Sequence, residues 1–126
     1  MKFNGKKLLL IGLCCLPFMT TFTPVSASGA VRTKDWSTPG GTGKTNCSVD
    51  VDLSDYSWDI RAYIWSTSLL SGYSHGDVWK TSSFSNGNKN CTVYTSVPIY
   101  NPLGTHVYTG ANSFNFWVSG STVYSS

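Results

Sequence analysis

Few residues of this chain are of the types that perform catalysis. Its two histidines are His75 and His106, and serines surround both, so a nucleophile activated by histidine would be the first reaction to consider. The sequence has no Gly-x-Ser-x-Gly elbow, no paired glutamates and no histidines at the spacing of metal ligands. We therefore predict that the chain is not an enzyme, with no catalytic residue, no metal site and no cofactor.

Four of the six acidic residues form one cluster, which contains Asp50, Asp52, Asp55 and Asp59. Asp50 and Asp52 would share one face of a strand, with Asp55 in the following turn, an arrangement of oxygen ligands that could suit calcium. The spacing is not that of an EF-hand, and aspartate commonly caps turns. We favour turn capping and a solvated strand face for these residues.

Residues 38–45 (Thr-Pro-Gly-Gly-Thr-Gly-Lys-Thr) are similar to a phosphate-binding loop. That loop requires a glycine where Thr38 stands. It also requires a strand before it and a helix after it, because amide groups at the helix N-terminus hold the phosphates. We interpret this stretch as a linker.

Aromatic residues with a polar group are the best candidates for ligand binding. The chain has seven Tyr and five Trp, and Tyr63 and Trp65 fall opposite the apolar positions of their strand. Trp79 and Trp117 are offset from apolar neighbours in the same way, as are two tyrosines, Tyr94 and Tyr100. Such rings suit a sugar, a lipid headgroup or a peptide, whereas the alternative is cross-strand pairing or a second buried face.

The N-terminus has the pattern of an export signal. Three lysines within the first seven residues precede an apolar run at 8–19, and small residues at 25–27 suit signal peptidase. The apolar run has about 12 residues, whereas a membrane-spanning helix needs about 20. Lipid attachment at Cys14 or Cys15 is the alternative, although Leu13 stands where that reaction needs a small residue. We predict that residues 1–27 are a signal peptide and that the secreted chain has no transmembrane segment.

Removal of the signal peptide would leave a neutral protein. The chain has nine Lys and Arg, of which three lie in the leader, so six remain against six acidic residues. A nucleic-acid-binding protein needs an excess of positive charge to neutralise phosphates, and a membrane-lytic peptide needs a cationic face. We exclude both classes.

Cys47 and Cys91 are the cysteines that remain after the leader. One pair in a small exported domain is typical of a structural disulfide. The bond would close a loop of about 45 residues and would contribute roughly 4 kcal/mol in the chain-entropy model. Such a contribution matters because a domain of this size buries only about 60–65% of the surface of its unfolded chain.

Alternation of apolar and polar residues dominates the chain from residue 46 onward. Seven short runs alternate with a period of two, and Asn86-Gly87 lies between two of them as a hairpin signal. This pattern predicts an all-β protein, a small antiparallel β-sandwich or barrel-like domain with one disulfide, over residues 46–126. Cys47 and Cys91 lie in the apolar phase of their runs, so both sulfur atoms should point inward. Residues 28–45 lack an apolar period and are predicted to be a flexible N-terminal arm.

Two segments resemble the lactococcin 972 family of secreted bacteriocins. They are residues 73–76 (Tyr-Ser-His-Gly) and 80–84 (Lys-Thr-Ser-Ser-Phe), and two further similarities occur at 40–42 and 113–117. Gly43 stands where the family has a tryptophan, and the two mature cysteines are additional. The resemblance implies a signal-exported β-sandwich that inhibits sensitive Gram-positive cells by engaging the cell-wall precursor lipid II.

We therefore predict a secreted, bacteriocin-like antibacterial protein that acts without covalent chemistry on the cell envelope of competing Gram-positive bacteria. Its partner would be a cell-wall precursor or another envelope component. The alternative is a secreted cell-wall, carbohydrate- or protein-binding module or inhibitor that uses the same aromatic surface. The predicted ligand-binding residues are Tyr63, Trp65, Tyr73, His75, Trp79 and Trp117.

Overall fold

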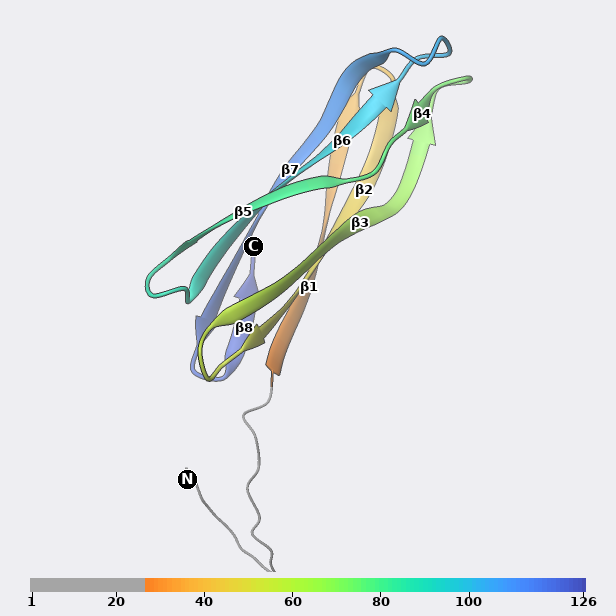
Figure 1. The fold of residues 1–126 in the computed structure, drawn as a ribbon. Coiled ribbons are helices and arrows are strands. Elements are labelled where there is room, and N and C mark those ends of the chain that lie inside the picture. The colour runs from red at the N-terminus through yellow and green to blue at the C-terminus, as the bar shows by residue number, and fades with distance from the viewer. Residues whose placement is uncertain (1–26) are drawn as a thin grey trace, which may run out of the picture.

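The computed structural model describes residues 27–126 (Figure 1). The predicted signal peptide lies outside the described residues, apart from Ala27, whose backbone opens the first strand. No helix occurs in residues 27–126, and 75% of these residues are in strands. The strands are β1 (Ala27–Thr38), β2 (Gly41–Asp52), β3 (Ser57–Leu69), β4 (Ser74–His75), β5 (Trp79–Ser85), β6 (Asn90–Tyr100), β7 (His106–Ser119) and β8 (Thr122–Ser125).

The strands form two antiparallel sheets, which confirms the predicted all-β class. The first sheet has the order β1-β2-β3. In the second sheet β6 pairs with β7 on one side, β7 pairs with β8, and both β4 and β5 pair with the other side of β6. The long strands of both sheets run along the length of the molecule (Figure 1). A membrane-spanning helix is therefore absent from the part of the chain that the structure describes.

The prediction of a flexible arm at residues 28–45 is wrong, and so is the interpretation of residues 38–45 as a linker. Both belong to a long hairpin in which β1 pairs with β2 over the whole length of both strands, from Ala27 opposite Asp52 to Thr38 opposite Gly41. The sequence shows no apolar period here because several inward positions of β1 carry polar side chains. These side chains bind backbone carbonyl groups of the second sheet and of the turn before β8, so β1 curls toward β7 and β8 and the sheets form a half-barrel.

Two polar contacts show how β1 is held. Lys34 donates to the carbonyl oxygen of Ser113 at 2.7 Å, and Ser28 donates to that of Ser121 at 2.7 Å. Both bonds lie at the exposed surface, and they join β1 to β7 and to the turn before β8. The position of β1 therefore depends on groups about 80 to 90 residues away along the chain.

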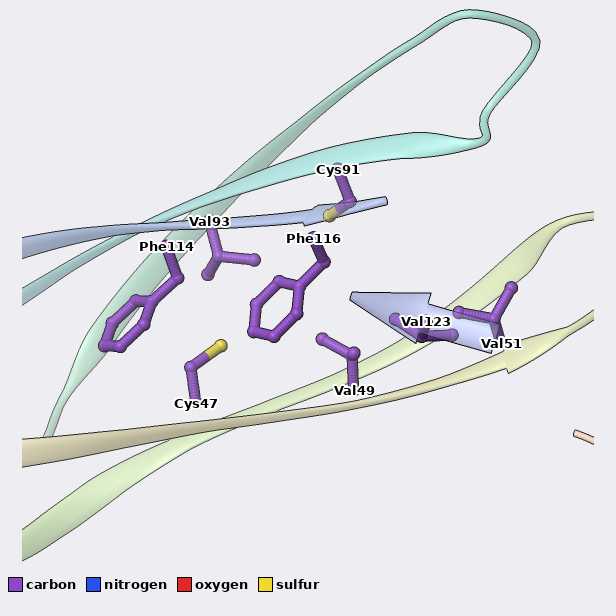
Figure 2. Packing of buried hydrophobic residues seen from close by; sticks show 8 residues of the cluster. All are labelled: Cys47, Val49, Val51, Cys91, Val93, Phe114, Phe116 and Val123. Carbon is purple, nitrogen blue, oxygen red and sulfur yellow. The ribbon is translucent and has the colours of Figure 1, made fainter. Parts of the chain in front are cut away.

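The larger core cluster lies between the two sheets, and each of its side chains is at most 8% exposed. Cys47 and Val49 project from β2 toward Phe114 and Phe116 of β7, with Cys91 of β6 above them (Figure 2). The prediction that both sulfur atoms point inward is confirmed. The full cluster is Cys47, Val49, Val51, Cys91, Val93, Phe114, Phe116 and Val123.

The structure holds Cys47 and Cys91 as free, buried thiols, so the disulfide stays a prediction. In the view of Figure 2 the ring of Phe116 lies between the two sulfur atoms. Removal from water raises the pKa of both thiols to about 11, and for Cys47 the neighbouring Cys91 adds to the rise. In the reduced state both groups are therefore protonated at neutral pH.

A second, smaller cluster surrounds Trp36 of β1. The indole is buried with Val97 and Ile99, and its nitrogen donates to the hydroxyl of Thr45 at 3.0 Å. A side chain at Gly43 or at Gly110 would place its Cβ atom within 3.0 Å of the indole. The absence of a side chain at both glycines therefore creates the space that the ring fills.

The turn between β5 and β6 follows the predicted hairpin signal. Asn86, Gly87 and Asn88 all have positive φ angles, between 54° and 64°. Asparagine and glycine tolerate this left-handed conformation better than other residues. The turn brings Ser85 opposite Asn90 and starts the β5–β6 ladder.

Candidate functional site

The outward surface of the second sheet carries the most concentrated group of exposed aromatic rings. Alternate residues of β6 are buried, from Cys91 to Ile99, so the residues between them, such as Thr92 and Tyr94, point away from the core. The ladder register extends this rule to β5, β7 and β8. Four large exposed rings lie at outward positions: Trp79 (73% exposed), Tyr94 (53%), Tyr124 (47%) and Trp117 (37%). The half-buried Tyr100 and the imidazole of His106 form a further outward pair at the end of the sheet.

We call these four rings and the residues between them the aromatic face. Trp79 lies opposite Ser96 on β6, and Trp117 lies opposite Asn90 on the same strand. These two partners are six residues apart, which at about 3.3 Å per residue corresponds to roughly 20 Å along the sheet. The face is therefore long enough for an extended ligand, with a tryptophan near each end.

The rings at each end lie beside a shallow hollow. Trp117 stacks on Tyr124, with ring centroids 6.0 Å apart and planes inclined by 19°. Beside Trp117 is a hollow of about 270 Å³, and between Trp79 and Tyr94 is another of about 200 Å³. Stacked and cross-strand rings lose little side-chain entropy when a ligand binds, because their neighbours already hold them.

Small polar side chains separate the rings. Thr92 donates its hydroxyl hydrogen to the amide oxygen of Asn115 at 2.9 Å, which leaves the amide NH₂ group of Asn115 free to donate. No outward position of β5, β6, β7 or β8 carries Asp, Glu, Lys or Arg. The remaining outward polar residues are Thr81, Ser83 and Ser85 on β5, Asn90, Ser96 and Tyr100 on β6, His106, Thr109, Ser113 and Ser119 on β7, and Thr122 on β8.

This arrangement suits non-covalent recognition of an uncharged, hydroxyl-rich ligand. Aromatic faces supply apolar contact area, and hydroxyl and amide groups supply directional hydrogen bonds. Comparison of the chain with protein-family models, curated proteins and solved structures found no match. The chemistry of the described side chains therefore carries the functional argument.

Tyr63 and His75 come together at a different place. They line a hollow of about 350 Å³ between β3 and the β4–β5 connection, together with Asp77 and Ile64. The ring nitrogen Nδ1 of His75 lies 2.9 Å from the carbonyl oxygen of Gly76. This hollow joins an imidazole, a phenol and a carboxylate, but it does not adjoin the aromatic face through any shared residue.

The other predicted binding residues lie apart from both places. Trp65 is 63% exposed on β3 of the first sheet, next to the bulge in the β2–β3 ladder. Tyr73 is half-buried and packs against the Trp36 cluster, so much of its ring belongs to the core. The six predicted residues therefore do not form one surface: Trp79 and Trp117 share the aromatic face, Tyr63 and His75 share a hollow, and Trp65 and Tyr73 lie elsewhere.

Sequence analysis missed Tyr124 as a member of the aromatic face. Its alternation with the buried Val123 was the available signal, because an inward residue sets its neighbour outward. Tyr94 was singled out as outward, but nothing in the local pattern places it on the same surface as Trp117. That relation depends on the β6–β7 register, in which Tyr94 lies opposite Ser113.

The acidic cluster confirms the predicted turn capping. The Asp52 carboxylate accepts hydrogen bonds from the backbone and hydroxyl of Ser54, and Asp55 accepts the same pair from Ser57. The hydroxyl bond from Ser54 is the main cause of the lowered pKa of Asp52. Asp50 and Asp59 instead flank Arg61, at 3.0 and 3.5 Å.

Another hollow, of about 520 Å³, lies on the first sheet. Hydroxyl residues of β2 and β3 line it, and Lys44 forms an ion pair with Asp35 at 2.8 Å beside it. Residues 38–45, which are similar to a phosphate-binding loop, here form the turn and the start of β2. This segment continues into the rest of β2 and not into a helix, so the amide groups of a helix N-terminus are not available to hold a phosphate.

Proposed function

We propose that this chain is a secreted antibacterial protein that binds the cell envelope of competing Gram-positive bacteria without covalent chemistry. The aromatic face is the observation that supports this proposal. Its rings are exposed on rigid strands of the second sheet rather than on loops. Exposed apolar area of this kind, bordered by polar groups, is typical of a binding surface.

The segments that resemble the lactococcin 972 family add support. Residues 80–84 lie within β5 and residues 113–117 lie within β7, so both contribute outward side chains to the aromatic face. His75, from the segment 73–76, lines the separate hollow that it shares with Tyr63. An envelope component is therefore the proposed partner, and export behind residues 1–27 would deliver the protein to it.

Substitution of the end tryptophans tests the proposal. Trp79→Ala and Trp117→Ala should each weaken binding to isolated cell walls at least about tenfold, since burial of one aromatic side chain contributes roughly 1.5–3 kcal/mol. Binding is measured by sedimentation with walls of sensitive bacteria, and inhibition is measured on lawns of the same strains. Trp65→Ala is the matched control, because the exposure of this tryptophan (63%) lies between those of Trp117 (37%) and Trp79 (73%) but the residue belongs to the other sheet.

Two results would contradict the proposal. One is wall binding that is equal in all three variants and the wild type. The other is a folded wild-type protein that sediments with no cell wall and inhibits no strain. A protein that binds walls through Trp79 and Trp117 but inhibits no strain would establish the second candidate, a wall- or carbohydrate-binding module, for which the same aromatic face is the favouring observation.

We also propose that Cys47 and Cys91 form a disulfide after export. Both side chains belong to one buried cluster, and they come from β2 and β6 in different sheets. Thiols oxidise readily outside the cytoplasm.

A further inference from the structure

The outward positions of β5, β6, β7 and β8 carry no Asp, Glu, Lys or Arg, and the outward histidine, His106, lies opposite Tyr100 at the end of the sheet beyond Trp79. Phosphate and carboxylate ligands are normally held by arginine or lysine, which form strong charge-assisted hydrogen bonds. Lys80 of β5 is exposed and borders the hollow beside Trp79, but it lies opposite the buried Thr95, so its side chain leaves the strand on the side away from the rings. The ammonium group of the neighbouring Lys34 donates a hydrogen bond to the carbonyl oxygen of Ser113.

A peptide ligand also fits this surface poorly. Extended peptides are usually recognised by addition to a sheet edge, where backbone groups remain free to form hydrogen bonds. The aromatic face is the flat side of a sheet, and the backbone groups of its central strands β6 and β7 are paired with each other and with their outer neighbours. The surface therefore offers side-chain rings, hydroxyls and amides only.

The geometry points to an uncharged glycan chain as the ligand. We propose that such a chain lies along the strands from Trp79 to Trp117, with its sugar rings stacked on the tryptophans and on Tyr94. This inference rests on the proposed function, since it names the envelope component that the aromatic face binds. The roughly 20 Å between the end tryptophans requires several sugar units rather than one.

The polar residues between the rings match sugar hydroxyl groups. Thr92 fixes the amide oxygen of Asn115, so the NH₂ group of Asn115 is oriented to donate to a sugar oxygen. Hydroxyl groups such as those of Ser83 and Ser113 both donate and accept, as sugar hydroxyls do. Recognition of this type needs no charge and changes little with salt, because screening acts on ionic contacts.

Chemically treated cell walls provide the test, with protein secreted from cells that express the full chain. Hydrogen fluoride removes phosphate-linked anionic polymers, whereas periodate oxidises the vicinal diols of sugars. Binding of the wild type to hydrogen-fluoride-treated walls should stay within about twofold of that to untreated walls. Binding to periodate-treated walls should fall at least tenfold, and salt of about 1 M, where the Debye length is about 3 Å, should have little effect.

Asn115→Ala serves as the variant for the hydrogen-bonding part of the site, because Asn115 is exposed and its loss should not disturb the core. It should weaken binding to hydrogen-fluoride-treated walls severalfold, and Trp65→Ala should leave it unchanged. Binding that disappears after hydrogen fluoride or in high salt would overturn the glycan assignment, and binding that survives periodate would exclude a glycan with vicinal diols as the ligand. If the glycan assignment is overturned but binding to untreated walls still depends on Trp79 and Trp117, the proposed function stands. If the wild type does not bind untreated walls, the glycan assignment and the proposed function both fail.

Discussion

Replacement of Trp36 by alanine is expected to lower the free energy of unfolding by about 3–5 kcal/mol, the range observed for truncation of large buried aromatic residues. Trp36 is only 5% exposed and joins Val97 and Ile99 in the smaller core cluster. Its removal also leaves the buried hydroxyl of Thr45 without the donor that now lies 3.0 Å away. Urea denaturation monitored by circular dichroism measures the change.

The two glycines that make room for Trp36 provide the matched variants. Gly43→Ala and Gly110→Ala should each destabilise the protein by about 1–3 kcal/mol, because an added Cβ would collide with the indole. In a chain that also carries Trp36→Leu, Gly43→Ala should cost less than about 0.5 kcal/mol, since the smaller side chain leaves space for the methyl group. Equal costs of Gly43→Ala in both backgrounds would show that the contact with Trp36 does not explain this glycine.

Reduction of the secreted protein is expected to lower its free energy of unfolding by roughly 4 kcal/mol, the contribution of a disulfide that closes a loop of about 45 residues. The intact mass before reduction should be lower by two hydrogen atoms than the mass after reduction. Urea denaturation with and without reductant gives the difference in stability. Two thiols that react with an alkylating reagent in denatured, unreduced protein would contradict the disulfide and would agree with the free thiols of the structure.

The pH dependence of the reduced protein adds a second measurement. The ordinary pKa of a cysteine is 9.0, and burial raises the pKa of Cys47 and Cys91 to about 11 in the folded state. A group whose pKa is raised by folding contributes stability below its unfolded pKa and loses it as the pH rises to the folded pKa. The reduced protein should therefore lose stability between pH 9 and pH 11, whereas the oxidised protein has no thiol to titrate in that range.

The conservative variant Cys91→Ser separates packing from the disulfide. In oxidised protein it should be severely destabilising, because it removes the bond and places a hydroxyl in an apolar cluster. In reduced protein only the second effect remains, so the cost should be smaller. A Cys91→Ser protein with the same urea midpoint as oxidised wild type would exclude a stabilising role for this bond.

The sequence by itself determined the features that depend on one strand or one turn. Alternation between Cys47 and Leu53 predicted a strand with a buried cysteine, because successive side chains of a strand point to opposite faces. The Asn86-Gly87 pair predicted a hairpin, because few other residues adopt a positive φ angle without strain. The outward positions of Trp79 and Trp117 follow from the same local rule.

Tertiary structure alone decided which of these pieces became neighbours. β1 has no apolar period, and it is a strand because its polar side chains meet carbonyl groups of distant residues, such as Ser113 and Ser121. Trp79 and Trp117 share one surface because both β5 and β7 pair with β6, whereas Trp65 lies on the other sheet. Side-chain period is a local property, but the identity, order and register of neighbouring strands depend on contacts across the whole chain.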